Sequence, residues 1–394
     1  MQKSKSESTS LVNFPKMARP APIVIAFFYE SISLYLSKGY SLEECMELDK
    51  DTTIDAIIQS MRSNGYDVVP VGDIDELVRR IGLGEHKNWD LGFSISEGMH
   101  GTGREAQIPG ILEAYQIPTV FSDAATLALG LDKAKTKMVL EYFGIPTAPF
   151  AVVPASCSDD TTRPVISHIL QRSRHERELR EFPLFIKPSC EGSSKGIYSF
   201  CKVNSPSELT DGVQKLQTKF PRQSILIERY LGGHEYSVSL LGTGASTRVI
   251  GTLHLDWDAA RKRKCQSDLA EISDDIFARG FLDVENKNTE NDKDVMKFLM
   301  SAESPEAQAS EQLALQVWRV MELRDAGRVD IRWGADGKPY VLEVNPLPGL
   351  APGYSFLTET ARLQGISHEK LIGEIISSAI ERNPHLKSLK IRDK

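Results

Sequence analysis

RVDIRWGADGKPYVLEVN, the stretch of residues 328–345, predicts a β-hairpin. Its Asp336-Gly337 pair is the two-residue turn favoured in tight hairpins, and apolar residues alternate with polar ones on both sides of it. Because side chains alternate between the two faces of a strand, this turn defines one uniformly apolar face. The expected pairs on that face are Val329 with Val344, Ile331 with Leu342, and Trp333 with Tyr340.

The opposite face of the hairpin gathers charged residues. Its expected pairs are Arg328 with Asn345, Asp330 with Glu343, and Arg332 with Val341. Like charges directly opposite each other destabilise a strand pair, so Asp330 and Glu343 need a cation close by. Arg328 and Arg332 would supply this positive charge in a network of ion pairs at the protein surface. The alternative is a divalent cation held by the two carboxylates and the Asn345 oxygen, which are hard ligands suited to Mg²⁺.

A lysine and a glycine-rich loop favour phosphate binding. In FPLFIKPSCEGSSKGI (182–197), Lys187 ends an apolar strand directly before Pro188 and a Gly/Ser-rich loop. Small residues let loop N–H groups approach phosphate oxygens. Strands at 182–186 and 197–200 would make this segment a second hairpin with the loop at its tip. The chain lacks the pattern GxxxxGK[ST], which excludes a Walker-type nucleotide site. The lysines of DKAKTK (132–137) are, on their own, typical of a solvated helix face.

Composition places the chain among globular proteins. Its 394 residues suggest two or three domains, and 41% are hydrophobic and 26% charged. A net charge of −7 argues against nucleic-acid binding. No apolar run approaches the length of a membrane span, and residues 1–20 lack the apolar core of a signal peptide and are expected to form a disordered tail. Five cysteines without CxxC spacing indicate free thiols and a cytoplasmic protein.

The order of elements predicts an α/β domain first. Strand-like segments at 22–28, 67–72, 89–96 and 118–122 alternate with helical ones at 53–65, 73–81 and 104–115. Such alternation implies βαβ units and a parallel sheet. From residue 126 the pattern changes to a helix with apolar spacing at Met138, Leu140 and Phe143, followed by β-rich runs. Residues 258–305 read as a mobile, solvated loop or small insertion, and helices are expected near 306–325, 355–364 and 367–382.

The ordered set of motifs resembles the D-alanine–D-alanine ligases of the ATP-grasp superfamily. The resemblance runs from about residue 89 to 380, on LALGLDKAKTK (127–137), FIKPSCEGSSKG (185–196), LIERYLGGHEYSV (226–238), GRVDIRWGADGKPYVLEVNPLPG (327–349) and the last helices. It implies a Rossmann-like N-terminal domain (21–125), a small central ATP-grasp lobe (126–230) and a C-terminal lobe (231–385). It also implies a ligase that uses ATP and Mg²⁺, or Mn²⁺ in its place, to form an acyl phosphate that an amine attacks.

The resemblance assigns roles along the nucleotide. Lys133 and Lys187 match lysines that contact ATP phosphates. The loop that covers the nucleotide corresponds to Glu191, Ser193 and Ser194. The hinge that recognises adenine corresponds to Glu228, Arg229 and Leu231. Glu235 matches the carboxylate that binds ribose.

Further matches lie at the reacting centre. Asp330, Glu343 and Asn345 match the magnesium ligands, in agreement with the hairpin geometry. Arg328 and the Gly349 N–H match groups that stabilise the transition state, and Ser193 belongs with them as a catalytic residue.

The chain departs from the family where the amino-acid substrates should bind. Glu30 stands where the family binds the first substrate's ammonium, but the surrounding residues differ. Glu97 replaces a histidine that lies near that substrate's carboxylate. Ser355 lies near the serine that holds the second carboxylate. The loop that helps to bind the second substrate falls within 255–270, where Lys262 or Lys264 would serve.

Several readings of function stay open. A ligase with the same mechanism would act on a different amino acid or on a secondary-metabolite acid. A nucleotide-binding regulator without turnover would be expected to lose the metal ligands or the arginine, and all are present. A dinucleotide-dependent oxidoreductase would use the Gly101-x-Gly103-x-x-Ala106 pattern with Asp123. The expected partners are small amino acids, with neither nucleic acid nor membrane, and a homodimer remains an open alternative.

Overall fold

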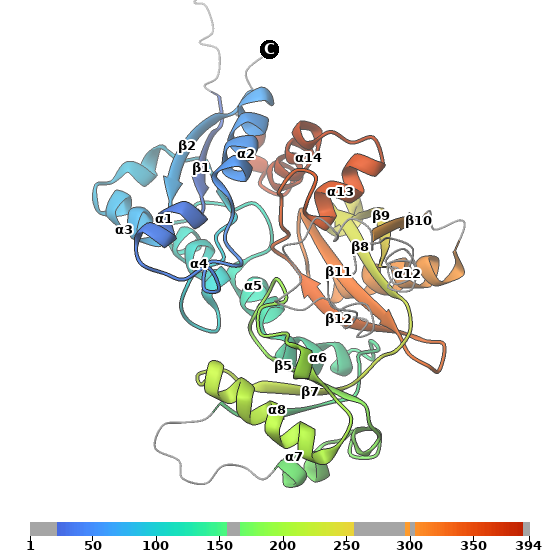
Figure 1. The fold of residues 1–394 in the computed structure, drawn as a ribbon. Helices are drawn as coiled ribbons and strands as arrows, with labels where there is room; N and C mark the ends of the chain where they lie inside the picture. Colours follow the sequence, from blue (N-terminus) through green and yellow to red (C-terminus); the bar gives the residue numbers. More distant parts are fainter. Residues whose placement is uncertain (1–21, 156–165, 256–295, 300–303, 389–394) are drawn as a thin grey trace, which may run out of the picture.

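The computed structural model describes residues 22–155, 166–255, 296–299 and 304–388. Three β-sheets organise this part of the chain. In Figure 1 the N-terminal sheet (blue) and the C-terminal sheet (yellow to red) lie beside each other, and the middle sheet (green) lies below them. The predicted combination of an α/β unit with two α+β units is confirmed.

The N-terminal sheet is parallel, as predicted. Its strand order is β2 (Asp67–Gly72), β1 (Val24–Phe28) and β3 (Leu91–Ser94). Successive side chains of β1 enter two different cores, one with α2 (Asp51–Ser63) and α14 (His368–Glu381), the other with α3 (Ile74–Gly82) and α4 (Gln107–Ala114). Burial on both faces explains why the sequence of β1 is a continuous apolar run.

Two segments of this part differ from prediction. Residues 118–122 do not form a strand, because only Thr119 makes a β-bridge, to Gly92. The helix expected from 127 divides into α5 (Ala124–Leu131) and α6 (Lys133–Tyr142), since Asp132 is extended and caps α6 by accepting the N–H of Lys135. The predicted apolar face of α6 is also wrong, because Met138 and Phe143 are 50% and 53% exposed, while Leu140 alone of the three is buried.

The middle sheet is antiparallel, in the order β4 (Phe150–Val153), β7 (Ile225–Arg229), β5 (Leu184–Pro188) and β6 (Lys202–Val203). Helices α7 (Ile166–Arg172) and α8 (Pro206–Lys219) pack against its apolar residues. The hairpin predicted between 182–186 and 197–200 is wrong in its second strand. Residues 199–201 form a 3₁₀ turn, and β5 pairs with β6 instead, so the connecting loop is longer than expected.

The C-terminal sheet is antiparallel and holds β10 (Met296–Leu299), β9 (Arg248–Leu255), β8 (Glu235–Leu241), β11 (Ala326–Trp333) and β12 (Pro339–Asn345). Helix α12 (Pro305–Val320) packs on one face and α13 (Phe356–Leu363) lies on the other. Part of the predicted 258–305 loop is therefore strand β10. The rest of that loop up to residue 303, with Lys262 and Lys264, lies outside the described residues.

The register of the β11–β12 hairpin agrees with prediction only near its open end. Arg328 pairs with Asn345, Val329 with Val344, and Asp330 with Glu343. A bulge follows, so that Ile331 pairs with Val341, Arg332 with Tyr340, and Trp333 with Pro339. The predicted pairs of Ile331 with Leu342, Arg332 with Val341, and Trp333 with Tyr340 are wrong. Leu342 is the extra residue, because a five-residue turn from Gly334 to Lys338 replaces the expected two-residue turn.

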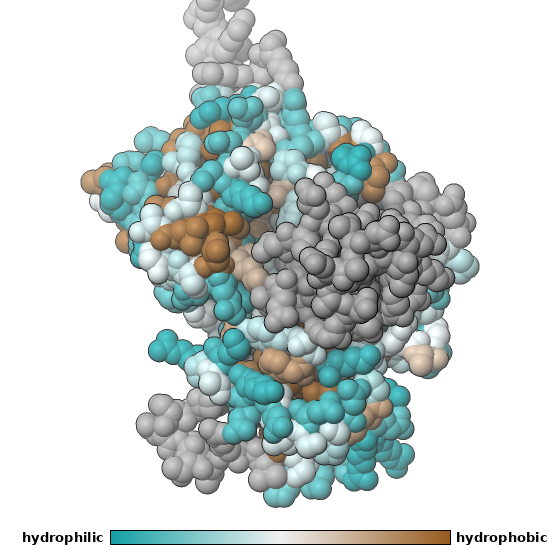
Figure 2. Space-filling view, in the orientation of Figure 1, coloured by the Kyte–Doolittle hydropathy of each residue, from teal (hydrophilic) through white to brown (hydrophobic). Residues whose placement is uncertain are grey.

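The described surface is mostly hydrophilic (Figure 2). In that view apolar side chains gather over α1 (Ile32–Ser37), where Leu34 and Leu36 are exposed. Among the described helices, none combines the length and the apolar character needed to cross a bilayer.

A fully buried carboxylate joins the N-terminal unit to the C-terminal helices. Asp325 accepts hydrogen bonds from the Phe121 N–H and the Ser378 hydroxyl, both at 2.8 Å. Arg382 forms an ion pair with it at 2.8 Å and donates to the Thr119 carbonyl. One charge thus holds the segment after β3 against the end of α14.

We predict that Arg382→Met lowers the free energy of unfolding by about 3–5 kcal/mol, because the buried Asp325 carboxylate loses its cation. Urea denaturation at pH 7 measures the change. Arg362→Met is the matched control, since Arg362 makes an exposed ion pair with Glu359, and its midpoint should stay close to that of the parent chain. Equal shifts in the two variants would show that Arg382 has no special role.

Candidate active site

A cavity of about 400 Å³ lies where the three units meet. Most of the residues that the sequence singled out line it, and they come from distant parts of the chain. They are Glu97, Lys133, Lys187, Glu191, Ser193, Ser194, Glu228, Arg229, Leu231, Glu235, Arg328, Asp330, Glu343, Asn345, Gly349 and Ser355. Glu30 is absent from the lining. The fold therefore brings almost the whole predicted set to one place.

Two lysines share one buried carboxylate in the cavity wall. Glu228 is 3% exposed, and its two carboxylate oxygens lie 2.6 Å from Lys187 Nζ and 2.9 Å from Lys137 Nζ. Burial by itself would raise the pKa of Glu228, but the two lysines lower it to about 2. Glu228 was expected beside adenine, and its carboxylate is occupied by the lysines instead.

Lys133 occupies the first turn of α6 and is buried, so the expectation of a solvated helix face fails for it. Its Nζ lies 2.9 Å from Glu343 Oε1 and donates to the Glu191 carbonyl at 2.5 Å. Burial acts to lower the pKa of Lys133, but the Glu343 carboxylate outweighs it and raises the pKa above its ordinary value. One ammonium group thus connects the hairpin to the glycine-rich loop.

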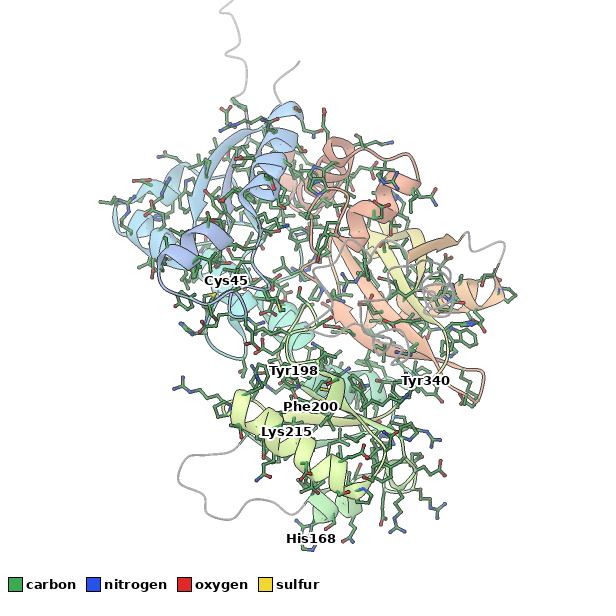
Figure 3. All side chains as sticks on the ribbon, in the orientation of Figure 1. Cys45, His168, Tyr198, Phe200, Lys215 and Tyr340 are labelled. Carbon is green, nitrogen blue, oxygen red and sulfur yellow. The ribbon has the colours of Figure 1, made fainter. Side chains whose placement is uncertain are left out.

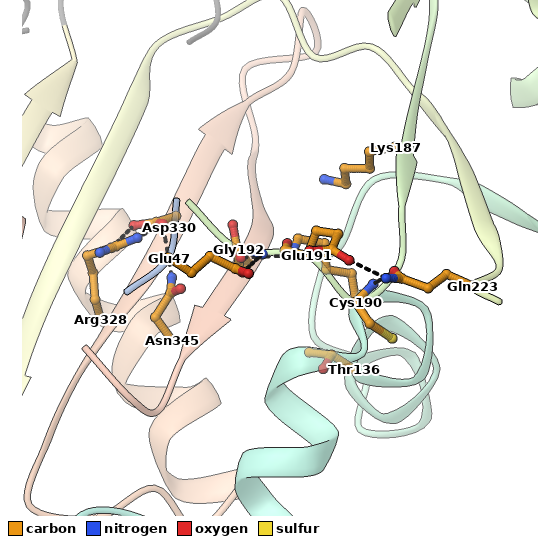
Figure 4. Close-up of polar contacts among 12 residues, drawn as sticks. Glu47, Thr136, Lys187, Cys190, Glu191, Gly192, Gln223, Arg328, Asp330 and Asn345 are labelled. Atoms are coloured by element: carbon orange, nitrogen blue, oxygen red, sulfur yellow. Dashed lines mark hydrogen bonds and ion pairs between the residues drawn. The ribbon is translucent and has the colours of Figure 1, made fainter. Parts of the chain in front are cut away.

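The charged face of the hairpin is assembled as predicted. Arg328 donates to both oxygens of Asp330 at 2.9–3.1 Å, and the Asn345 amide donates to Asp330 at 3.0 Å (Figure 4). Ser237, on the neighbouring strand β8, donates to the same carboxylate at 2.7 Å. The like charges of Asp330 and Glu343 are therefore offset by Arg328 on one side and Lys133 on the other.

Arg332 does not take part in that charge balance. Its guanidinium lies 3.2 Å from Glu235 and 5.2 Å from the ring centroid of Tyr230. The bulge after Asp330 changes the course of the hairpin between the two arginines. Glu235, the predicted ribose ligand, is thus held by Arg332 at the cavity wall. At the hinge, Arg229 pairs with Glu181 at 2.8 Å, and Leu231 is buried.

The glycine-rich loop is fastened to the N-terminal unit. Glu47 accepts the N–H of Gly192 at 2.6 Å (Figure 4). It also pairs with Arg104 at 2.6 Å. Lys195 lies 3.1 Å from Glu191 and 3.5 Å from Glu47. Gln223 also donates to Glu191. Glu191 therefore anchors the loop through its side chain and holds Lys133 through its carbonyl.

Backbone geometry and a second contact fix the loop further. Ser193 and Ser194 adopt positive φ angles of 50° and 62°, which turn the chain tightly over the cavity. Below them Tyr198 donates to Glu43 at 2.9 Å and stacks on Phe200 with ring centroids 5.2 Å apart. Figure 3 labels both rings at the edge of the middle unit that faces the N-terminal unit.

Gly349 and Ser355 are packed against each other at the start of α13. A Cβ atom on Gly349 would lie 2.7 Å from Ser355 Oγ, so a larger residue there would displace the Ser355 side chain. Ser355 Oγ accepts the N–H of Ala351 at 3.1 Å. Gly349, predicted to stabilise the transition state, and Ser355, predicted to bind the second substrate, thus lie in one turn at the cavity wall.

Glu30 supports the substrate side without lining it. It is buried, and one carboxylate oxygen accepts the N–H groups of Glu97 at 3.0 Å and Gly98 at 3.4 Å. Burial raises the pKa of Glu30 to about 7. The structure therefore places Glu30 behind the turn that carries Glu97, and the expectation of a direct substrate contact by Glu30 does not fit this geometry.

The dinucleotide alternative has no support in the structure. Asp123, the residue needed for ribose, caps α5 by accepting the Thr126 N–H and pairs with Arg324 at 2.6 Å. Gly101 and Gly103 lie after β3, the third strand to appear along the chain, and lead through a short 3₁₀ turn into α4. The glycine pattern therefore shapes the loop between β3 and α4.

Sequence reasoning missed four residues of this region. Lys137 could have been found, because it lies one helical turn after Lys133 on the same face of α6. Glu47, Arg104 and Glu105 gave no local signal, since Glu47 meets its loop partner Gly192 across 145 residues. Only the tertiary fold brings them together.

Comparison with known proteins identifies relatives of this arrangement. A family model described as D-ala D-ala ligase C-terminus matches residues 139–377. A D-alanine–D-alanine ligase of Neisseria meningitidis is 29% identical over 347 residues, which cover 87% of this chain and 96% of the relative. One of Alcanivorax borkumensis is 29% identical over 349 residues, covering 88% and 93%. The structure of a Bacillus anthracis D-alanine–D-alanine ligase complexed with ATP aligns with a TM-score of 0.64 at 20% identity, covering 92% of this chain and 99% of that one, which shows a shared fold.

We predict that Glu228→Gln destabilises the chain by about 3 kcal/mol at pH 7, because two buried ammonium groups lose their common counter-ion. The pKa of Glu228 is depressed from an ordinary 4.5 to about 2, so its stabilisation is complete above 4.5 and is lost as pH falls towards 2. Urea denaturation should therefore show the gap between parent and variant narrowing from pH 7 to pH 3. Glu181→Gln, an exposed control, should show no such trend. A constant gap for Glu228→Gln would contradict the assignment.

Proposed function

Because the chain belongs to the D-alanine–D-alanine ligase family, we propose that it uses Mg-ATP to join the carboxylate of one amino acid to the amine of another. It is an ATP-dependent ligase, and a D-amino acid pair is the substrate that the names of its relatives favour. One observation carries the proposal. The lysines of α6 and β5 and the acidic hairpin face enclose a single cavity, which is the arrangement that phosphoryl transfer to a carboxylate requires.

The residues present fit a magnesium ion. Asp330 and Glu343 face each other on adjacent strands, and the Asn345 side chain lies 3.0 Å from Asp330. Two carboxylates and an amide oxygen are hard ligands, and Mg²⁺, or Mn²⁺ in its place, keeps waters and phosphate oxygens as its others. Arg328 and Lys133 pair with the two carboxylates, and both cations line the same cavity.

The chain's own side chains have distinct tasks in this reaction. When bound, Mg-ATP supplies the γ-phosphoryl group that turns a poor acyl donor, the carboxylate, into an acyl phosphate. Lys187 and Lys133 place positive charge beside the phosphates, and Arg328 offsets the charge that develops at the acyl centre. The loop of Ser193 and Ser194 excludes the water that would hydrolyse the acyl phosphate. We assign the Gly349 N–H to the tetrahedral oxyanion.

A ligase for a different acid and a regulator without turnover remain the alternatives. The intact set of Arg328, Asp330, Glu343 and Asn345 favours turnover over regulation. The acidic residue Glu97 at the substrate side favours an acid other than D-alanine.

Cell context and assembly form part of the proposal. We expect a cytoplasmic enzyme that acts on small molecules and binds neither nucleic acid nor membrane, in keeping with its net charge of −7 and the free thiols of Cys45, Cys190 and Cys201. Domain boundaries near 125 and 230 are supported by the three separate sheets. A homodimer stays open as the assembly, and the mass of the protein in solution would test it.

The decisive experiment measures phosphate release from ATP with magnesium and a panel of D- and L-amino acids, singly and in pairs. We predict amino-acid-dependent release, and that Arg328→Ala lowers kcat by about 10²-fold while the KM for ATP changes little, since a transition-state contact is lost.

Arg332→Ala provides the contrast. Arg332 lies four residues along the same strand but holds Glu235, so its loss should raise the KM for ATP more than it lowers kcat. A wild-type kcat for Arg328→Ala would remove that residue from the reaction, and absence of phosphate release with every amino acid would refute the ligase proposal.

We further predict that Asp330→Asn raises the magnesium concentration needed for half-maximal activity by about tenfold or more, because one anionic ligand is lost. Magnesium titrations of phosphate release measure it. Asp336→Asn, in the turn of the same hairpin, is the matched control and should leave the titration unchanged. If both variants titrate like the parent chain, the metal lies elsewhere.

A further inference from the structure

The N-terminal wall of the cavity is strongly acidic. Glu47, Asp49, Glu97 and Glu105 all line it, and Met46 and Leu48 add apolar surface between them. A single α-ammonium group would offset one of these charges. The number of carboxyl groups on this wall therefore exceeds what an amino acid with a neutral side chain can neutralise.

The cations near this wall already have partners. Arg104 pairs with Glu47 at 2.6 Å and donates to the Cys190 carbonyl at 2.6 Å. Lys195 lies between Glu191 and Glu47, and Lys133 is bound to Glu343. Of the four acids on the wall, Glu47 alone thus forms ion pairs within the described residues, while the Arg104 guanidinium also acts to lower the pKa of Glu97 and of Glu105 without outweighing the effects that raise it.

The other three acids face the cavity without such partners. Glu105 is 9% exposed, and within the described residues its carboxyl group makes no hydrogen bond or ion pair. The same holds for the side chains of Asp49 and Glu97. Burial raises the pKa of Asp49 and of Glu105 to about 7, and burial together with Glu105 raises that of Glu97 well above its ordinary range. A cation in the cavity would relieve this cost.

A metal ion is not the group that fits. Within the described residues no three Asp, Glu, His or Cys side chains converge closely enough to hold one. The acids are instead spread along the wall, with Glu97 held in place from behind by Glu30. An organic cation with two ammonium groups can contact more than one of these acids at once.

We propose that the first amino acid of this ligase carries a second cationic group in its side chain, so that the substrate class is the diamino acids. The inference rests on the proposed ligase function. The reacting carboxylate points to Lys187 and Arg328, and the α-ammonium and the side-chain ammonium lie against Asp49, Glu97 and Glu105. A neutral side chain would leave buried carboxyl groups unpaired, which makes the wall selective against it.

Matched pairs of substrates test this directly. Ornithine and norleucine differ only by an ammonium in place of a methyl group, as do 2,4-diaminobutyrate and norvaline. Each is offered as D and L isomer with D-alanine as the second amino acid, and kcat/KM for phosphate release is measured. We expect at least one diamino acid to exceed its neutral partner, and alanine, by tenfold or more. Equal values, or a preference for alanine, would overturn the inference and leave the ligase function standing.

Variants of the wall identify the residues responsible. Glu105→Gln, Asp49→Asn and Glu97→Gln should each reduce the preference for the diamino acid by about tenfold, and Glu97→His should shift preference towards D-alanine. Asp75→Asn is the control, since that side chain is 88% exposed on the same unit and should leave the preference unchanged. An unchanged preference in all three wall variants would mean that these carboxyl groups are protonated and bind no substrate ammonium. That result would overturn the inference.

Binding separates this inference from the ligase function. If no amino acid releases phosphate, the function fails, and calorimetry with magnesium and a non-hydrolysable ATP analogue decides the rest. Ornithine or 2,4-diaminobutyrate binding at least tenfold more tightly than its neutral partner would support the acidic subsite. Equal affinity would overturn it.

Discussion

Asp330 and Glu343 face each other across two strands, and the cations that offset this pair connect the parts of the molecule. Glu343 forms an ion pair with Lys133, which lies in the first turn of α6, and Lys133 donates to the carbonyl of Glu191 in the glycine-rich loop. Asp330 fixes Arg328 at the reacting centre. The cations that offset the repulsion on this hairpin are thus the groups that position α6, the glycine-rich loop and β11 around one cavity.

The cavity divides its charge between two ends. At one end Lys137 and Lys187 share Glu228, and Lys133 and Arg328 lie nearby, so cations gather there. At the other end lie the carboxyl groups of Asp49, Glu97 and Glu105. Under the proposed function, this separation of charge would orient a substrate that carries a carboxylate at one end and amines at the other.

The sequence predicted an α/β unit followed by two α+β units, the parallel sheet, and the lysines and hairpin residues of the cavity, because those features follow from local periodicity and motif order. It placed Asp330 opposite Glu343 correctly but lost the register beyond, since nothing local distinguishes a five-residue turn with a bulge at Leu342 from a tight turn at Asp336-Gly337. Lysines clustered on a helix are usually solvated. The burial of Lys137 could not be predicted locally, because it depends on the Glu228 carboxylate, which lies 91 positions away in the chain. The wall around Glu105 depends entirely on tertiary contacts.

Lys195 connects two carboxylates that belong to different units. Its ammonium lies between the carboxylate of Glu47, on the N-terminal unit, and that of Glu191, on the same glycine-rich loop as Lys195 itself. If the loop left the N-terminal unit, Lys195 would keep Glu191 and Glu47 would keep Arg104, so neither charge would be left bare. Separation of the loop from the N-terminal unit therefore costs only the ion pairs that cross between them, and dissolved salt screens those pairs.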